Sequence, residues 1–72
     1  MPRSEARVTP RSARGIRTRS ALVTAARTVF ERDGYLEARL ADISAEAGVA
    51  SGSLYTYFEG KEEIFQAVAD QI

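Results

Sequence analysis

The order of apolar and polar residues indicates a chain built of helices. Between residues 18 and 33, apolar side chains return every three or four positions, as in an amphipathic helix; they are Leu22, Val23, Ala26, Val29 and Phe30. Thr18 is expected to cap this helix, and Gly34 stands where a left-handed residue ends one. Tyr35 and Leu36 follow and are expected to fold back onto the core.

Two short helices joined by a glycine turn are predicted next. Apolar residues at helical spacing place the first over about 40–47, and Gly48 is expected to end it. The second is expected over about 51–57, with Gly48, Val49 and Ala50 forming the turn before it. Its inner face is expected to carry Leu54, Phe58 and most of Tyr55.

A fourth helix is predicted from Lys61 to the last residue, on an apolar stripe of Ile64, Phe65, Val68, Ala69 and Ile72. No stop signal ends it, so we expect it to continue toward a further domain beyond this chain. No segment alternates like a strand. The sequence therefore predicts an all-α fold, a homeodomain-like helix-turn-helix bundle of three helices plus the start of a fourth.

Charge is distributed unevenly along the chain. The net charge is zero, but residues 1–19 hold six arginines and one glutamate (+5), which leaves −5 on residues 20–72. Residues 1–16 contain both prolines and no apolar period, so they are predicted to be a disordered basic arm before a domain over 17–72. Charge alone fits both a polyanion partner reached through this arm and a leader that only aids solubility.

The residue types that are missing exclude several functions. The chain has no Cys and no His, so it lacks disulfides, the usual zinc ligands and the usual general base. We therefore expect no metal, no cofactor and no enzymatic activity. No apolar run is long enough to span a membrane and no secretory signal is present, so the cytoplasm is the expected compartment.

A short helix, a glycine turn and a second short helix form the pattern of a helix-turn-helix, here over about 39–58. The second helix of such a motif enters the DNA major groove with its N-terminal residues at base edges. Small residues at 51–53 would allow that approach, and Thr56 offers a methyl group for thymine or a hydroxyl for phosphate. The same small residues also fit a simple loop and cap. A helical protein-interaction module is the alternative function, because the last apolar stripe needs a partner.

Two more side chains are candidates for contacts with phosphate. Tyr57 lies off the inner face, where its hydroxyl can reach a phosphate oxygen, although a half-buried surface tyrosine fits as well. Lys61 begins a helix whose free backbone N–H groups already favour an anion, so a cation there suggests a phosphate nearby. A solvated lysine is the equally weighted alternative.

Three segments together resemble the DNA-binding domain of TetR-family transcriptional repressors: TRSALVTAARTVFERDGY, DISAEAGVASGSLYTYF and GKEEIFQAV. The resemblance runs from about Arg17 to Ile72. It implies that the helix beginning near residue 51 is the recognition helix, with base contacts from Ser51, Gly52, Ser53, Tyr55 and Thr56. It also implies phosphate contacts from Tyr57, Lys61, Arg17, Thr18 and Arg19.

The chain departs from the family pattern at several helix starts. The family commonly has Thr at the positions of Ala38 and Arg39, so Arg39 is expected to replace a phosphate contact by its charge. Ala50 stands where a Ser usually caps the recognition helix, so Ser51 is expected to cap instead. Gly60 replaces a common Ser and is expected to weaken the cap of the last helix.

The resemblance finally implies a function for the whole protein. It would be a ligand-responsive repressor of the bacterial cytoplasm, acting on the double-stranded DNA of the nucleoid. A homodimer, held by a C-terminal domain absent from this chain, would place two recognition helices ~34 Å apart on a palindromic operator. A small-molecule effector would bind outside this fragment.

Overall fold

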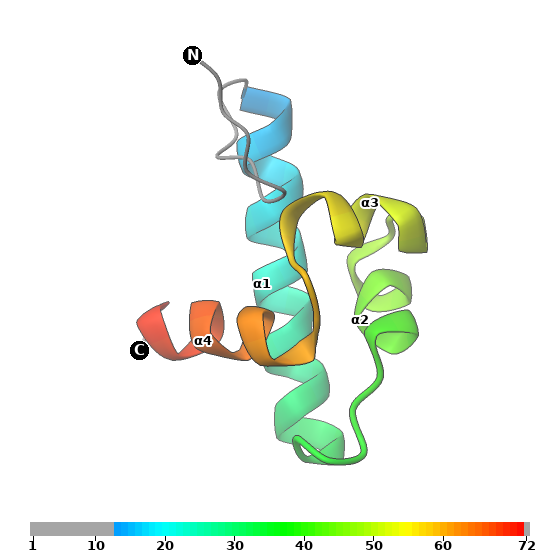
Figure 1. The fold of residues 1–72 in the computed structure, drawn as a ribbon, viewed down its shortest axis with the longest axis vertical. Coiled ribbons are helices and arrows are strands. Elements are labelled where there is room, and N and C mark those ends of the chain that lie inside the picture. The colour runs from blue at the N-terminus through cyan, green and yellow to red at the C-terminus, as the bar shows by residue number, and fades with distance from the viewer. Residues whose placement is uncertain (1–12, 72) are drawn as a thin grey trace.

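A computed structural model describes residues 13–71, and within them the chain forms four helices and no strand. They are α1 (Ala13–Asp33), α2 (Leu40–Ala47), α3 (Ser51–Tyr57) and α4 (Lys61–Gln71). The long α1 forms the axis of the molecule, with α2 and α3 on one side and α4 crossing it (Figure 1). The predicted all-α fold is confirmed, as are the positions of the two short helices and the start of α4. No helix in residues 13–71 is long and apolar enough to cross a bilayer.

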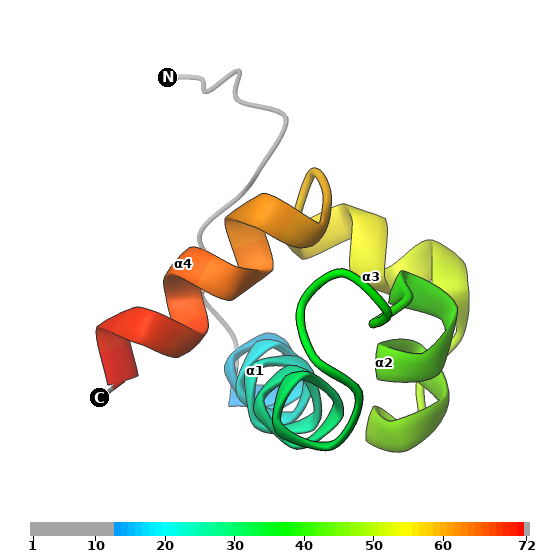
Figure 2. The ribbon, with the colours of Figure 1, turned by 90° about the horizontal axis from the view of Figure 1, so that it is seen from below.

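The core lies where the other three helices meet α1. A view along α1 shows α2, α3 and α4 arranged around it (Figure 2), and α1 contacts each of them. Every helix contributes fully buried apolar side chains, chiefly Leu22, Val23, Val29, Ile43, Leu54 and Ile64, with Phe58 just after α3. Burying each such side chain contributes about 1.5–3 kcal/mol, so this one cluster holds all four helices in place.

The start of α1 differs from the prediction. The helix begins at Ala13 and not near residue 18, so residues 13–16 are helical and the predicted disordered arm was too long. The rest of that arm, residues 1–12, lies outside the described residues. Thr18 is not a cap, because its hydroxyl donates to the carbonyl of Arg14 (3.0 Å) one turn earlier in the helix. These first turns are largely exposed, so no apolar period marks them.

The α1–α2 connection reverses the chain tightly. Gly34 adopts φ 84° and its N–H donates to the carbonyl of Phe30 at 2.8 Å, which confirms it as the left-handed end of α1. Tyr35 packs its ring against Phe30 at a centroid distance of 5.6 Å, as expected. Leu36 was predicted to pack inward but is 86% exposed. The turn closed by the Ala38 N–H on the Gly34 carbonyl gives the buried position to Ala38 instead.

Charged side chains join the end of α1 to α2. Arg32 pairs with Asp33 (Nε to Oδ1 3.0 Å) and lies 3.8 Å from Glu46 of α2. The hydrogen bond from Arg32 holds the pKa of the Asp33 carboxyl below its ordinary value. The pair is exposed, so its contribution to stability is small.

Candidate nucleic-acid interface

The turn between α2 and α3 is closed by backbone hydrogen bonds. Gly48 adopts φ 77°, and its N–H donates to the carbonyl of Ala45 at 3.2 Å, which confirms that it ends α2. The N–H of Val49 donates to the carbonyl of Ser44 at 3.0 Å. These bonds satisfy the last carbonyls of α2 and fix the direction in which the chain enters α3.

The residue that caps α3 differs from the one that the sequence suggested. Ala50 is the capping residue, with extended φ −68° and ψ 149°, and its carbonyl accepts the N–H of Ser53 at 3.0 Å. The prediction that Ser51 caps the helix is therefore wrong: Ser51 is the first helical residue and is exposed. Its hydroxyl is not needed as a cap.

One side of α3 is buried and the opposite side is open. Leu54 is fully buried and fixes the inner face. Tyr55 is 51% exposed, so the interpretation that it is mostly core is wrong. A step of one residue turns a helix by about 100°, which carries Tyr55 from the inner face to the outer surface. The five predicted base-contact residues are all exposed or half-buried and lie on this one helix; they are Ser51, Gly52, Ser53, Tyr55 and Thr56.

Gly52 lies at the centre of this surface. It is helical and exposed, and its φ is not in the left-handed region. Beyond its chain neighbours and the α3 backbone, a Cβ added to it would meet no described atom within 4 Å. Neither the backbone nor the packing of residues 13–71 therefore requires a glycine there. The hydroxyl of Thr56 lies 3.5 Å from the Gly52 carbonyl, a long contact that leaves the hydroxyl able to turn outward.

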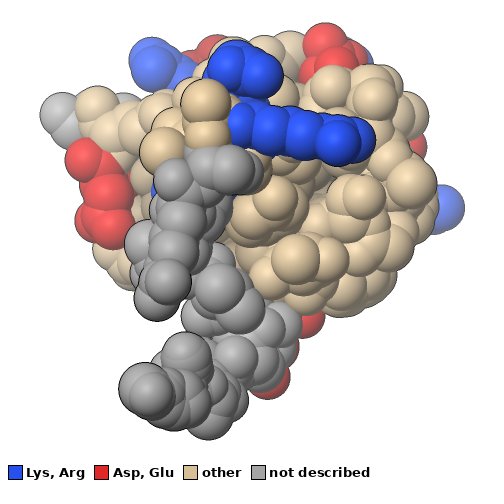
Figure 3. All heavy atoms as spheres, turned by 90° about the horizontal axis from the view of Figure 1, so that it is seen from above, with Lys and Arg blue, Asp and Glu red and all other residues tan. Residues whose placement is uncertain are grey.

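Three of the predicted phosphate contacts are exposed arginines. Arg17 and Arg19 are exposed on α1, and Arg39 is exposed just before α2, where it makes no side-chain capping bond within the described chain. The guanidinium of Arg19 lies 5.0 Å from the ring centroid of Phe58, the residue that ends α3. Basic side chains extend across the face formed by the N-terminal end of α1 and by α3, and acidic atoms lie toward its rim (Figure 3). One exposed arginine, Arg19, thus lies beside the end of α3, and α3 itself carries no charged side chain.

The remaining predicted phosphate contacts are more enclosed. Thr18 is half-buried with its hydroxyl bonded inside α1, and Tyr57 is half-buried against the core. Lys61 is half-buried, and its ammonium donates to the carbonyls of Tyr35 (2.8 Å), Ala38 (3.0 Å) and Leu36 (3.4 Å). An ammonium has three N–H donors, so a phosphate would have to displace one of these carbonyls.

The start of α4 has a capping bond that we did not predict. The backbone N–H of Glu59 donates to the carboxylate of Glu63, and the Gly60 carbonyl accepts the N–H of Ile64 at 3.2 Å. The carboxylate of Glu63 therefore bonds the residue before Gly60, one position earlier than the backbone N–H that a capping box uses. The two bonded residues, Glu59 and Glu63, lie four positions apart in the sequence.

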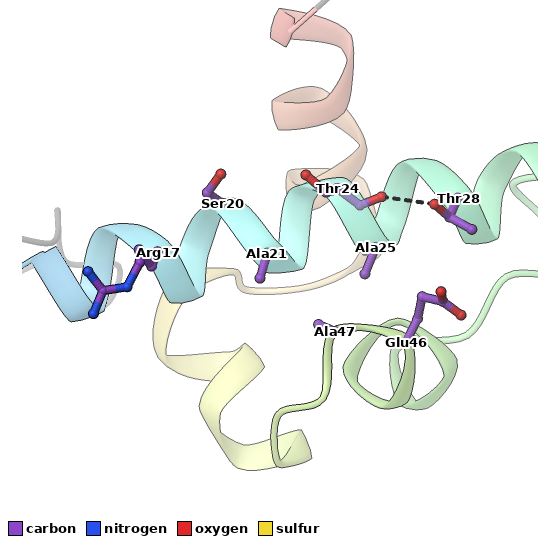
Figure 4. A pocket seen from close by; sticks show the side chains of 8 residues that line it. All are labelled: Arg17, Ser20, Ala21, Thr24, Ala25, Thr28, Glu46 and Ala47. Carbon is purple, nitrogen blue, oxygen red and sulfur yellow. Dashed lines mark hydrogen bonds between the residues drawn. The ribbon is translucent and has the colours of Figure 1, made fainter.

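A shallow groove of about 560 Å³ runs between α1 and α2. The side chains of Ala21, Ala25 and Ala47 line it, with Arg17 toward one end and Glu46 toward the other (Figure 4). The small side chains explain how the two helices approach closely. Within residues 13–71 no group of three or more Asp, Glu, His or Cys side chains gathers to hold a metal ion.

Comparison with known proteins agrees with this geometry. The family model of bacterial regulatory proteins, tetR family, matches residues 22–68, which is more than half of the chain. The chain is 39% identical over 61 residues to the A-factor receptor protein of Streptomyces griseus, covering 85% of this chain and 22% of that protein. It is 38% identical over 55 residues to the HTH-type transcriptional regulator TtgR of Pseudomonas putida, covering 76% of this chain and 26% of that protein.

A third similar protein is the HTH-type transcriptional repressor BepR of Brucella suis, 41% identical over 51 residues, which cover 71% of this chain and 24% of that protein. The chain therefore spans about a quarter of the length of these relatives. No solved structure matches it.

Proposed function

This chain belongs to the TetR family of bacterial DNA-binding transcriptional regulators, and we propose that it is the operator-binding part of a ligand-responsive repressor. The family is one of regulators and not of enzymes, in agreement with the prediction from the sequence. The single observation that carries the proposal is the outer surface of α3: small, polar, uncharged and exposed, on a helix fixed to the core by Leu54.

In the proposed complex α3 lies in the major groove. Ser51 and Ser53 donate or accept hydrogen bonds at base edges, and Gly52 permits the close approach. Thr56, one turn along, offers its methyl group to thymine or its hydroxyl to phosphate. Tyr55 adds an apolar edge, which its exposure supports.

The flanking residues hold the DNA backbone. Arg17, Arg19 and Arg39 contribute charge to the phosphates, while Thr18 and Tyr57 contribute polar groups beside them. Each phosphate neutralised releases counterions, so affinity falls as salt rises, with a slope of about −0.9 per contact in log–log units. Sequence preference arises from α3 and general affinity from the flanking charges.

We propose that dimerisation and effector binding involve parts of the protein outside residues 1–72; the relatives are about four times as long as the matched region. A homodimer on a palindromic operator would set the two α3 helices ~34 Å apart, and an effector that changes this spacing would release the DNA. One relative is named a receptor and another a repressor, which supports this reading. The proposed location is the bacterial cytoplasm, at the nucleoid.

The experiment is selection of bound duplexes from a random double-stranded library, followed by titration of the enriched sequence at several salt concentrations. We expect a preferred site whose sequence changes with Ser53→Ala or Thr56→Ala. Arg17→Ala should weaken binding to all duplexes alike and lower the salt slope by about 0.9. Absence of salt-dependent duplex binding would overturn the proposal and favour the helical interaction module.

A further inference from the structure

Lys61 joins the two ends of the helix-turn-helix unit. The unit, α2 with its turn and α3, is entered through the connection at residues 34–39 and left through residues 58–60. Lys61 directly follows its exit, and its ammonium bonds three carbonyls at its entrance, those of Tyr35, Leu36 and Ala38. The bonded residues are 23 to 26 positions apart in the chain. The Lys61 side chain thus links the segment that enters the helix-turn-helix unit to the residue that follows it.

The contact is built for a cation. Two of the three carbonyls lie at 2.8 and 3.0 Å from the nitrogen, and the Tyr35 ring centroid lies at 4.7 Å. The same ring packs against Phe65 of α4 at a centroid distance of 5.0 Å. Aromatic contacts therefore support the hydrogen bonds between Lys61 and the three carbonyls, which we call the clamp. Hydrogen bonds from a charged donor are about twice as strong as neutral ones, and they have the greatest effect where they are partly shielded from water.

We infer that Lys61 is a positioning residue, which sets where α2 and α3 lie against α1 and α4, and not a phosphate contact. The inference rests on the proposed DNA-binding function only for its effect on affinity; the clamp itself is a property of the free protein. A second cation supports the other end, because Arg19 of α1 stacks on Phe58 at the end of α3. Lys61 faces inward to backbone carbonyls, whereas Arg19 is exposed and lies over the Phe58 ring from the surface.

The test compares Lys61→Met with Arg17→Met in the intact protein. Methionine keeps the length of the lysine side chain but has neither charge nor donors, and Arg17→Met removes an exposed cation of α1 as a matched control. Two quantities are measured: the salt slope of binding to a labelled duplex of mixed sequence and about 30 base pairs, and amide hydrogen exchange in the DNA-free protein.

For Lys61→Met we expect an unchanged salt slope and at least a tenfold rise in the exchange of the Ala38 and Ile43 amides, which the Gly34 and Arg39 carbonyls accept. Arg17→Met should do the reverse: a slope lower by about 0.9 and unchanged exchange. A lowered slope in Lys61→Met overturns the inference, and so does unchanged exchange. If the wild-type chain binds no duplex, the proposed function fails while hydrogen exchange still decides the role of Lys61.

A second variant covers the case in which Lys61→Met does not fold. Lys61→Gln is neutral but keeps N–H donors, so part of the clamp can form. We expect a smaller rise in exchange than for Lys61→Met and the wild-type salt slope. A slope lowered by about 0.9 in Lys61→Gln would assign the ammonium to phosphate and overturn the inference.

Discussion

Replacing Gly52 by alanine should stabilise the free protein and weaken its binding to DNA. A glycine inside a helix costs roughly 0.5–1 kcal/mol relative to alanine, because the unfolded chain loses more freedom. At Gly52 the backbone is helical, and beyond its chain neighbours and the α3 backbone an added methyl group would meet no described atom within 4 Å. The substitution adds no strain, and its position in the first turn of α3 puts the expected gain near 0.5 kcal/mol.

The expected effect on DNA has the opposite sign. If α3 lies against base edges, the added methyl group fills the space that Gly52 leaves for them. Overpacking a close interface costs about 1–3 kcal/mol, which corresponds to a loss of roughly 5- to 150-fold in affinity. If Gly52→Ala stabilises the protein and weakens DNA binding, the glycine is required by the approach of DNA and not by the fold.

Thermal unfolding followed by circular dichroism and titration of the enriched duplex measure the two effects. A gain of 0.5 kcal/mol should raise Tm by about 2–4 °C in a domain of this size. Gly48→Ala is the matched control: the φ of Gly48 is 77°, so alanine there should lower stability by about 1 kcal/mol or more. A fall in Tm for Gly52→Ala, or unchanged affinity, would refute the reasoning.

Three further predictions concern other sites. Ser44 is 2% exposed and its hydroxyl has no partner among the described residues, so Ser44→Ala should raise stability by about 1 kcal/mol in urea unfolding; a loss would reveal a partner. Arg39→Ala should lower the salt slope by about 0.9 and leave α2 intact, and an unchanged slope would remove Arg39 from the phosphate contacts. NMR titration should place the pKa of Asp33 below 3.8. Because the folded pKa is lowered, the stability from the Arg32–Asp33 pair is present at higher pH and is lost as pH falls through that folded pKa; Asp33→Asn should lack this loss.

Apolar spacing predicted the elements that have one buried face. Leu54 and Phe58 placed α3, and glycines at 34 and 48 marked the helix ends because both adopt positive φ. The turns at 13–17 were missed because they are largely exposed and have no inner stripe. Tyr55 was misplaced because it directly follows the buried Leu54. The spacing alone did not show whether Tyr55 lies on the buried or the exposed face of α3.

The role of Lys61 could not be predicted from sequence spacing. Its acceptors are main-chain carbonyls more than twenty residues away in the sequence. Every residue has such a carbonyl, so the residue types do not show which ones bind Lys61. Its position at the start of α4 suggested an anion partner, since that is the local rule for a helix N-terminus. The fold supplies carbonyl oxygens instead. The candidate base contacts were easier to predict, because exposure on a short helix follows from the position of Leu54.

Because α3 carries no charge, its outer residues and the basic side chains of the fold lie on different elements. Its outer residues can be exchanged without altering the basic groups on α1 and before α2, which we propose attract DNA. A duplicated copy of such a gene could therefore acquire a new target sequence through a few substitutions on one short helix while keeping its general attraction to DNA.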